Sequence, residues 1–184
     1  MDPRGDRSKG VTATTATLPA TATSALDFDA LYRDARDDVF AYTATLLRDS
    51  AAAEDVTAQA FERAYKRRSR FDARRGSPRA WLFGIARNAA LDELRRRKRV
   101  ETTELPAPSS APGPDEAAEL AAERDAVRRA LGTLAAKDCE LIALKYHADL
   151  SNGDIAAVLG INANHVGTLL HRAMTKLREA VEHA

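Results

Sequence analysis

A basic segment followed by a tryptophan and an asparagine is the first group of residues that could do chemistry. Residues 66–79 hold seven Lys and Arg against a single acid, Asp72, and Trp81 and Asn88 follow soon after. An indole can stack on an unpaired base, an amide can hydrogen-bond a base edge, and guanidinium groups can hold phosphates. Together these residue types predict a surface that binds single-stranded nucleic acid.

Helical spacing supports this interpretation but leaves two roles open for the tryptophan. Trp81, Asn88 and Arg95 recur near one face of a helix, whereas Leu82 and Ala86 are available for a core. A lone tryptophan in a small domain is often a core residue, so Trp81 has a structural interpretation beside the functional one. The expected nucleic-acid contacts of this part of the chain are Arg70, Arg74, Arg75, Trp81, Arg87, Asn88, Asp92, Arg95 and Arg96.

Residues 150–173 carry the pattern of a helix-turn-helix. Ala156 supplies a small residue where the two helices cross, Gly160 a turn residue that tolerates positive φ, and Val166 an apolar plug. Ser151 and Asn162 can cap the two helices, and Ile161 is expected to fill the gap between them. The alternative is a plain helical hairpin inside a bundle.

The second helix of this motif is expected to lie in the major groove of DNA. Asparagine can read an adenine edge, and arginine can hold a phosphate or a guanine. The residues expected to contact DNA here are Asn162, Ala163, Asn164, His165, Gly167, Thr168, His171 and Arg172.

Catalytic and metal-binding patterns are absent from the sequence. The four histidines do not combine with Cys139 or with carboxylates at metal-ligand spacing. No Gly-rich phosphate loop and no nucleophile motif occurs. Asp34, Asp37 and Asp38 could suggest a metal-dependent nuclease, but a solvated helix face explains them better. We therefore expect a protein that is not an enzyme, with no cofactor, metal or small-molecule substrate.

Helices must position these residues, because the composition favours no other element. Ala, Leu, Arg and Glu dominate, and strand formers never alternate over a useful run. Apolar residues at steps of three or four predict helices at 28–47, 51–67 and 78–99. A break is expected near the start of the first, which would make four helices in this part of the chain. Two more are expected at 115–131, stopped by Gly132, and at 137–146, before the helix-turn-helix.

A change of composition divides the chain. Residues 101–114 contain four prolines together with Ser109, Ser110 and Gly113, which predicts an extended linker. At about 3.3–3.6 Å per residue it reaches at most roughly 45–50 Å. Residues 26–100 hold 17 basic and 12 acidic residues, whereas residues 101–125 hold one basic and seven acidic ones. Two functional units on either side of an acidic linker are therefore expected.

The predicted fold class is all-α, with two small helical domains joined by a flexible Pro/Ser/acidic linker and the helix-turn-helix in the second. The predicted boundaries are a disordered extension at 1–25, which could also reflect a mistaken start codon, a first domain at 26–100, the linker at 101–116 and a second domain at 117–184. The single cysteine and the lack of a long apolar stretch predict a cytoplasmic protein without membrane insertion.

Three motifs together resemble one protein family. Residues 53–65 (AEDVTAQAFERAY) and 77–99 (SPRAWLFGIARNAALDELRRRKR) resemble conserved region two of the extracytoplasmic-function (ECF) sigma factors. The helix-turn-helix, ending in LLHRA at 169–173 and followed by KLR at 176–178, resembles their region four. The resemblance covers residues 26–100 and 117–182.

This resemblance implies a dissociable subunit that gives bacterial RNA polymerase its promoter choice. Region two would bind the largest subunit and open the minus-ten element, with the basic loop forming the pocket for a flipped-out base. Region four would bind the second-largest subunit and the minus-thirty-five element. An anti-sigma protein is a further expected partner. The residues placed where the family contacts core polymerase are Glu54, Asp55, Gln59, Phe61 and Glu62.

The sequence departs from the common family pattern at two places. Residues 58–61 read AQAF where many relatives have QETF, so one acid of the polymerase contact is lost. Residues 166–169 read VGTL where many have VKSR, so the usual basic pair of the recognition helix is absent. The minus-thirty-five specificity of better-known members therefore does not transfer to this chain.

Two other functions compete with promoter-specific initiation. A stand-alone helix-turn-helix regulator would bind duplex DNA unaided, but the basic, aromatic first part and the lack of a dimerisation helix with heptads argue against it. A small nucleic-acid enzyme is the second alternative.

Overall fold

The computed structural model describes residues 26–101 and 118–183, and every secondary-structure element in this part of the chain is a helix. The expected extension at 1–25 and most of the expected linker lie outside the described residues. The helices are α1 (Phe28–Leu47), α2 (Ser50–Arg67), α3 (Pro78–Glu101), α4 (Ala118–Thr133), α5 (Ala136–Tyr146), α6 (Asn152–Leu159) and α7 (Ala163–Glu182). Two short 3-10 turns, Arg68–Arg70 and Ala73–Arg75, shape the segment between α2 and α3.

The first helix is continuous, so the predicted break near its start does not occur and three helices precede the linker. Asp27 caps α1, because its carboxylate accepts a hydrogen bond from the Ala30 N–H at 3.0 Å. Its inner face then runs without interruption through Leu31, Ala35 and Val39. A capped helix with an unbroken apolar stripe has no reason to break.

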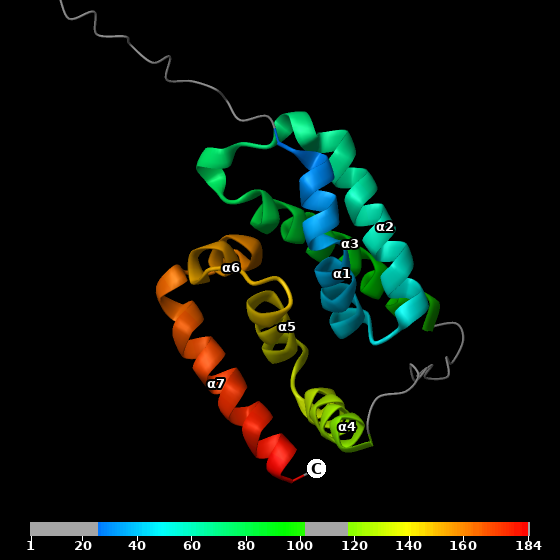
Figure 1. Ribbon diagram of the computed structural model, residues 1–184, viewed down its shortest axis with the longest axis vertical. Helices are drawn as coiled ribbons and strands as arrows, with labels where there is room; N and C mark the ends of the chain where they lie inside the picture. Colours follow the sequence, from blue (N-terminus) through cyan, green and yellow to red (C-terminus); the bar gives the residue numbers. More distant parts are fainter. Residues whose placement is uncertain (1–25, 102–117, 184) are drawn as a thin grey trace, which may run out of the picture.

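Helices α1, α2 and α3 pack against one another as a three-helix unit (Figure 1). The buried side chains are mostly small, which lets the helices approach closely. Thr43 and Thr57 are buried polar residues, and their hydroxyl oxygens lie 3.0 Å apart. The Thr43 hydroxyl also lies 3.0 Å from the Phe40 carbonyl, so this pair adds no unsatisfied polar group to the core.

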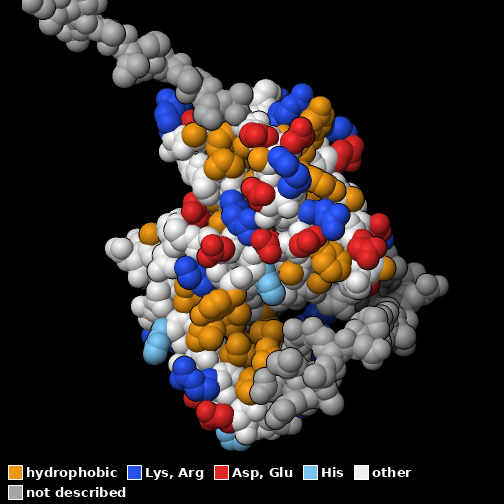
Figure 2. Space-filling model, in the orientation of Figure 1, with side chains coloured by type: hydrophobic (Ala, Val, Ile, Leu, Met, Phe, Trp, Pro, Cys, Tyr) orange, Lys and Arg blue, Asp and Glu red, His pale blue; other side chains and the backbone are white. Residues whose placement is uncertain are grey.

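The second unit contains α4 to α7, with α7 packed on α4, α5 and α6. Gly132 lies within the last turn of α4 rather than ending it, because α4 continues to Thr133. Leu134, Cys139, Ile142 and Ala173 form a small buried cluster here. Figure 2 shows apolar side chains gathered on the face of this unit, below the mixed charges that cover the first unit.

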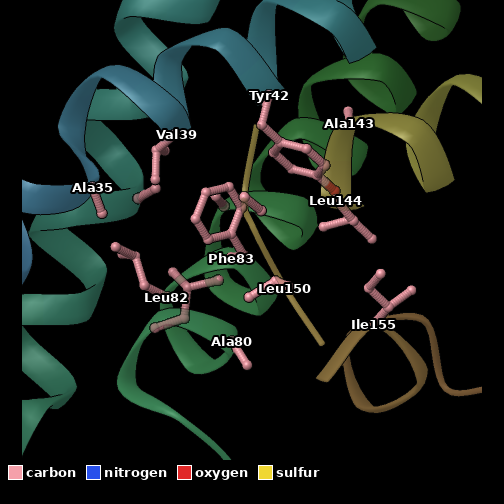
Figure 3. Packing of buried hydrophobic residues seen from close by; sticks show 14 of the residues in the cluster. Ala35, Val39, Tyr42, Ala80, Leu82, Phe83, Ala143, Leu144, Leu150 and Ile155 are labelled. Atoms are coloured by element: carbon pink, nitrogen blue, oxygen red, sulfur yellow. The ribbon is translucent and has the colours of Figure 1, made fainter. Parts of the chain in front are cut away.

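The two units share one hydrophobic core. Helix α1 packs on α5, and α3 packs on α6. Tyr42 and Phe83 from the first unit are fully buried beside Leu144, Leu150 and Ile155 from the second (Figure 3). The rings of Tyr42 and Phe83 meet edge to face at 5.4 Å. The described residues therefore form a closed arrangement in which each unit covers part of the other.

We expect Leu82→Ala to lower the free energy of unfolding by about 2–5 kcal/mol, because Leu82 is fully buried and its removal leaves a cavity. Leu94→Ala on the same helix should cost less than about 0.5 kcal/mol, since Leu94 is already 36% exposed. Urea denaturation of both variants measures the two values. Equal destabilisation by the two substitutions would contradict this packing.

Candidate nucleic-acid interface

The start of α3 fixes the tryptophan beside the basic loop. Pro78 is the first residue of the helix, and the Ser77 hydroxyl accepts a hydrogen bond from the Ala80 N–H at 3.1 Å. Trp81 follows in the first turn and is partly buried. Its ring meets the edge of Phe71 from the loop, with the two centroids 5.6 Å apart. Trp81 is thus neither a core residue nor a free surface residue.

Trp81 and Phe71 line a cavity of about 470 Å³ between the loop and α3. Arg70 and Arg75 reach it from the loop, and Asn88 lines it from α3. A cavity of this size is in the range that holds small aromatic ligands. An aromatic pair, an amide and two guanidinium groups around one cavity suit an unpaired base and its flanking phosphates.

The arginines of the loop differ in whether another side chain already pairs with their guanidinium group. Arg74 donates from Nε to the Asp72 carboxylate at 2.9 Å, and this contact lowers the pKa of Asp72. Arg68 stacks over the Tyr65 ring at 3.9 Å. Within residues 26–101 and 118–183, the side chains of Arg70 and Arg75 make no hydrogen bond or ion pair. Their charges remain available for phosphates.

Backbone geometry at Gly76 sets the shape of the loop. Gly76 has φ 150° and ψ 176°, a conformation open almost only to glycine. The chain can therefore turn from the second 3-10 segment straight into the cap of α3.

The remaining sequence-predicted residues of α3 do not gather at the cavity. Arg87 donates from Nε to Glu140 of α5 at 2.7 Å. Asp92 pairs with Arg63 and Arg95, and Arg96 pairs with Glu93. The pairs of Asp92 and Arg96 are mostly exposed and so contribute little in water, whereas the Arg87–Glu140 pair is largely buried. Phe71 is not among the residues expected from the sequence, although an aromatic residue inside a basic loop is a signal that could have identified it.

The helix-turn-helix has the local geometry that its sequence predicts, apart from one residue. Ser151 accepts from the Asp154 N–H, and Asn162 from the Asn164 N–H. Gly160 has φ 67°, and Val166 is fully buried. Ile161 does not fill the gap between the helices as expected, because its side chain is 37% exposed.

Helix α7, which the sequence predicts to contact DNA, presents an exposed face. The side chains of Asn164, His165, Thr168 and Arg172 are exposed and make no hydrogen bond or ion pair within the part of the chain that the structure describes. Ala163, Gly167 and His171 are exposed as well, whereas the Asn162 side-chain oxygen is used in the cap.

Gly167 is not required by packing against the preceding helix. A Cβ at Gly167 would meet the Asn152 side chain at 3.8 Å, an ordinary contact. The structure therefore accommodates alanine at this position.

A second surface lies along α1 and α2. Glu54, Asp55, Gln59 and Glu62 are exposed on α2. Phe61 differs, because it is only 6% exposed and lies against the Tyr32 ring, with the two centroids 4.8 Å apart. Tyr32, Phe40 and Phe61 line a groove of about 550 Å³. Contact with the lysine one turn on, Lys66, lowers the pKa of Glu62.

The described residues carry neither a metal cluster nor a membrane span. No group of three His, Cys, Asp or Glu among them could hold a metal ion. None of the helices within 26–101 and 118–183 combines the length and the apolar character needed to cross a membrane.

Family models match both units of the chain. The model described as Sigma-70 region 2 matches residues 31–100, and the model described as Sigma-70, region 4 matches residues 124–177. The chain is 33% identical over 162 residues to the ECF RNA polymerase sigma factor SigL of Mycobacterium tuberculosis, covering 86% of the chain and 91% of that protein. It is 30% identical over 156 residues to the RNA polymerase sigma-E factor of Streptomyces coelicolor, covering 84% of the chain and 85% of the relative.

Two solved structures share the fold of this chain. The sigma factor RpoE in complex with the anti-sigma factor NepR, from Bartonella quintana, matches with a TM-score of 0.71 and 24% identity, covering 85% of this chain and 97% of that one. CnrH in complex with the cytosolic domain of CnrY matches with a TM-score of 0.59 and 24% identity, covering 84% and 87%.

We expect Arg70→Gln combined with Arg75→Gln to reduce the salt dependence of single-stranded DNA binding. The slope of log K against log salt should fall in magnitude by about 1.4, at about 0.7 per phosphate contact. Anisotropy of a labelled oligothymidylate over a range of NaCl measures the slope. Arg97→Gln is the control, because Asp49 and Glu93 already hold the Arg97 guanidinium. An unchanged slope in the double variant would exclude both arginines as phosphate contacts.

Proposed function

The chain belongs to the extracytoplasmic-function sigma factors of RNA polymerase, and from this premise we propose which of its residues divide promoter recognition between the two units. Sigma factors are transcription initiation factors that recognise promoters for RNA polymerase, and they are not enzymes. The two units carry different kinds of DNA-binding group. One suits an unpaired strand and the other a duplex, and each unit is assigned the promoter element that has this form.

The first unit captures the minus-ten element as an unpaired strand. The observation that carries this proposal is the cavity that brings Trp81 and Phe71 together with Asn88 and two unpaired arginines. The aromatic pair stacks on a flipped base, the Asn88 amide hydrogen-bonds its edge, and Arg70 and Arg75 hold the adjoining phosphates. Arg74, Arg95 and Arg96 lie outside the cavity and act on the flanking backbone. Asp92 has no charge to offer a phosphate and instead pairs with Arg63 and Arg95.

The second unit reads the minus-thirty-five element as a duplex. Helix α7 enters the major groove with Asn164, His165 and Thr168 toward the base edges, and Arg172 reaches a phosphate. Gly167 adds no side chain and no charge at the centre of this face. The backbone of α7 can therefore approach the groove closely.

Core polymerase and an anti-sigma protein are the protein partners. The acids of α2 and the groove beside Tyr32 form the polymerase surface of the first unit. The apolar groove between α4 and α7, about 590 Å³ in volume and lined by Ala130 and Ala180, supports a second contact. A solved sigma factor of the same fold was determined in complex with an anti-sigma factor, which supports the same kind of partner here. Because the chain acts together with RNA polymerase, its location is the cytoplasm.

Promoter-dependent run-off transcription tests this function directly. Purified core RNA polymerase is combined with the chain and a library of fragments randomised over the promoter region. We expect transcripts only when the chain is present, from templates that share two spaced elements. Tight sequence-specific binding of the chain alone to duplex DNA, without transcripts, would instead identify a stand-alone regulator.

In the same assay, Trp81→Ala should reduce promoter opening by about tenfold or more, because base stacking contributes about 1–3 kcal/mol per base. Asn88→Ala should also reduce opening more than polymerase binding. Permanganate reactivity of unpaired thymines measures opening, and co-purification measures polymerase binding. Trp81→Phe keeps an aromatic ring and should recover part of the opening. If Trp81→Ala loses its helical circular dichroism, Trp81 holds the fold and not the base.

For the second unit, we expect Asn164→Ala to change which minus-thirty-five sequences are accepted, at a cost of roughly 1–3 kcal/mol for a lost bidentate base contact. Arg172→Ala should weaken every sequence about equally, because a phosphate contact carries no sequence information. Selection from the randomised library measures both effects. If selection with the Asn164→Ala variant yields the wild-type consensus, Asn164 does not contact a base.

A further inference from the structure

The helix-turn-helix has almost no positive charge where it would meet DNA. Residues 146–171 hold two acids, Asp149 and Asp154, and neither a lysine nor an arginine. Arg172 is the first basic residue of α7 and lies in its third turn. Phosphate contacts by Lys and Arg supply the sequence-independent part of duplex affinity. That part is therefore small here, and contacts to base edges carry more of the binding.

The lysines that flank this stretch are directed into their own unit. The Lys145 ammonium donates to the Leu150 carbonyl oxygen at 3.2 Å, and the Lys176 ammonium donates to the Asp138 carboxylate at 2.6 Å. Neither lysine makes up for the missing charge on the first turns of α7.

The first turns of α7 present two rows of short, uncharged side chains. Val166 is fully buried and marks the inner side of the helix. Asn164 and Thr168 are exposed and lie one turn apart, so they form one row on the outer side. Ala163 and Gly167 are also exposed and one turn apart, and they form a second row beside it. In a helix-turn-helix these N-terminal residues are the ones that contact base edges.

These residue types match one kind of base pair. An asparagine amide pairs with N6 and N7 of adenine, and the methyl groups of alanine and threonine contact the C5 methyl of thymine. The groups that pair with O6 and N7 of guanine belong to arginine and lysine, which the first turns of α7 lack. An A·T pair therefore finds partners on this face for both of its bases.

His165 does not change this match. Its two ring nitrogens point apart, so they cannot make the two parallel hydrogen bonds that distinguish guanine. One ring N–H can donate to N7, but adenine and guanine both present N7 in the major groove. A single bond from His165 therefore leaves the two purines equivalent.

Short side chains touch base edges only if the helix backbone comes close. Gly167 allows this approach, because it places no side chain between the backbone and the groove. The absence of charge and the presence of glycine thus serve the same mode of binding.

We propose that α7 selects a minus-thirty-five element of A·T base pairs and does not select guanine. Asn164 reads adenine, and the methyl groups of Ala163 and Thr168 contact thymine. The proposal rests on the proposed function, since it names the sequence class that the second unit reads.

Thymine contacts are tested with the complex of the chain and core RNA polymerase, by competition between duplex promoters. Deoxyuridine in place of thymidine within the minus-thirty-five element removes only the C5 methyl. We expect the affinity to fall about fourfold for each contacted methyl, from about 0.8 kcal/mol per buried carbon. Thr168→Ser lacks its own methyl but keeps the hydroxyl, so the uridine opposite it should cost this variant nothing further.

Thr175→Ser is the matched control on the same helix. It makes the same change of side chain, but the Thr175 hydroxyl donates to the His171 carbonyl oxygen at 3.0 Å, beyond the base-facing turns. This variant should stay as sensitive to uridine as the wild-type chain.

The adenine contact is tested with 7-deazaadenine, which lacks N7 and still pairs with thymine. The wild-type complex should bind the substituted duplex about fivefold more weakly, because half of a bidentate contact is lost. Asn164→Ala should bind the two duplexes equally.

A guanine reader can also be added. A Cβ on Gly167 would lie 3.8 Å from the nearest atom, the Asn152 amide nitrogen, so an arginine fits there. Gly167→Arg should introduce a guanine at one position of the selected element and steepen the salt slope by about 0.9. Gly153→Arg adds the same charge on α6, where a Cβ has an equally ordinary contact with the Ser151 hydroxyl. It should leave every position of the consensus unchanged.

Three results would overturn the proposal: a wild-type consensus that requires guanine in the minus-thirty-five element, no shared minus-thirty-five sequence at all, or equal binding of thymine and uridine duplexes. Promoter-dependent transcripts would still support the proposed function in each case. If no template yields transcripts, the proposed function fails and the proposal fails with it. Circular dichroism checks that each variant is folded, and the two base analogues test the wild-type chain without any substitution.

Discussion

Helix α3 is buried on nearly every side over its first half, and the other helices are arranged around it. Ala80, Leu82, Phe83, Ile85, Ala86, Ala89 and Ala90 are all buried there, so no stripe of this segment faces water as a whole. α1 and α2 cover it from one side and α6 from another. Small side chains bring these helices close, while Leu82 and Phe83 are among the largest fully buried side chains. The same helix carries Trp81 and Asn88, so the segment that organises the core also positions the cavity.

The elements of the fold could be predicted from the sequence, because their signals are local. Helical periodicity, the Ser151 and Asn162 caps and the turn at Gly160 involve neighbours within a few residues, and the structure confirms them. The packing of the two units could not be predicted. Leu144 and Ile155 fit an inner face of the second unit equally well, and nothing in their spacing shows that Phe83 lies beside them. The composition of the linker also suggested separation rather than contact.

The candidate site divides in the same way. The charge of the loop and the presence of Trp81 and Asn88 could be predicted as a group, and the structure brings them to one cavity. Which acid each arginine pairs with could not be predicted in every case. Arg96 and Glu93 lie three residues apart, and their pairing is a local matter. Arg87 and Glu140 are 53 residues apart in the chain, and only the tertiary fold brings them within 2.7 Å. Ion pairs at exposed positions such as Arg95 with Asp92 are weak in water, so phosphates can replace them easily.

The shared core has a thermal consequence. Parting the two units moves the apolar side chains of Leu144, Leu150 and Ile155 from a dry contact toward water, so the separation carries a positive heat-capacity change. The apolar share of such a contact weakens on cooling, unlike an interface made of ion pairs alone. Temperature by itself therefore shifts the balance between joined and parted units, because a positive heat-capacity change makes the stability of the contact fall on both sides of a maximum.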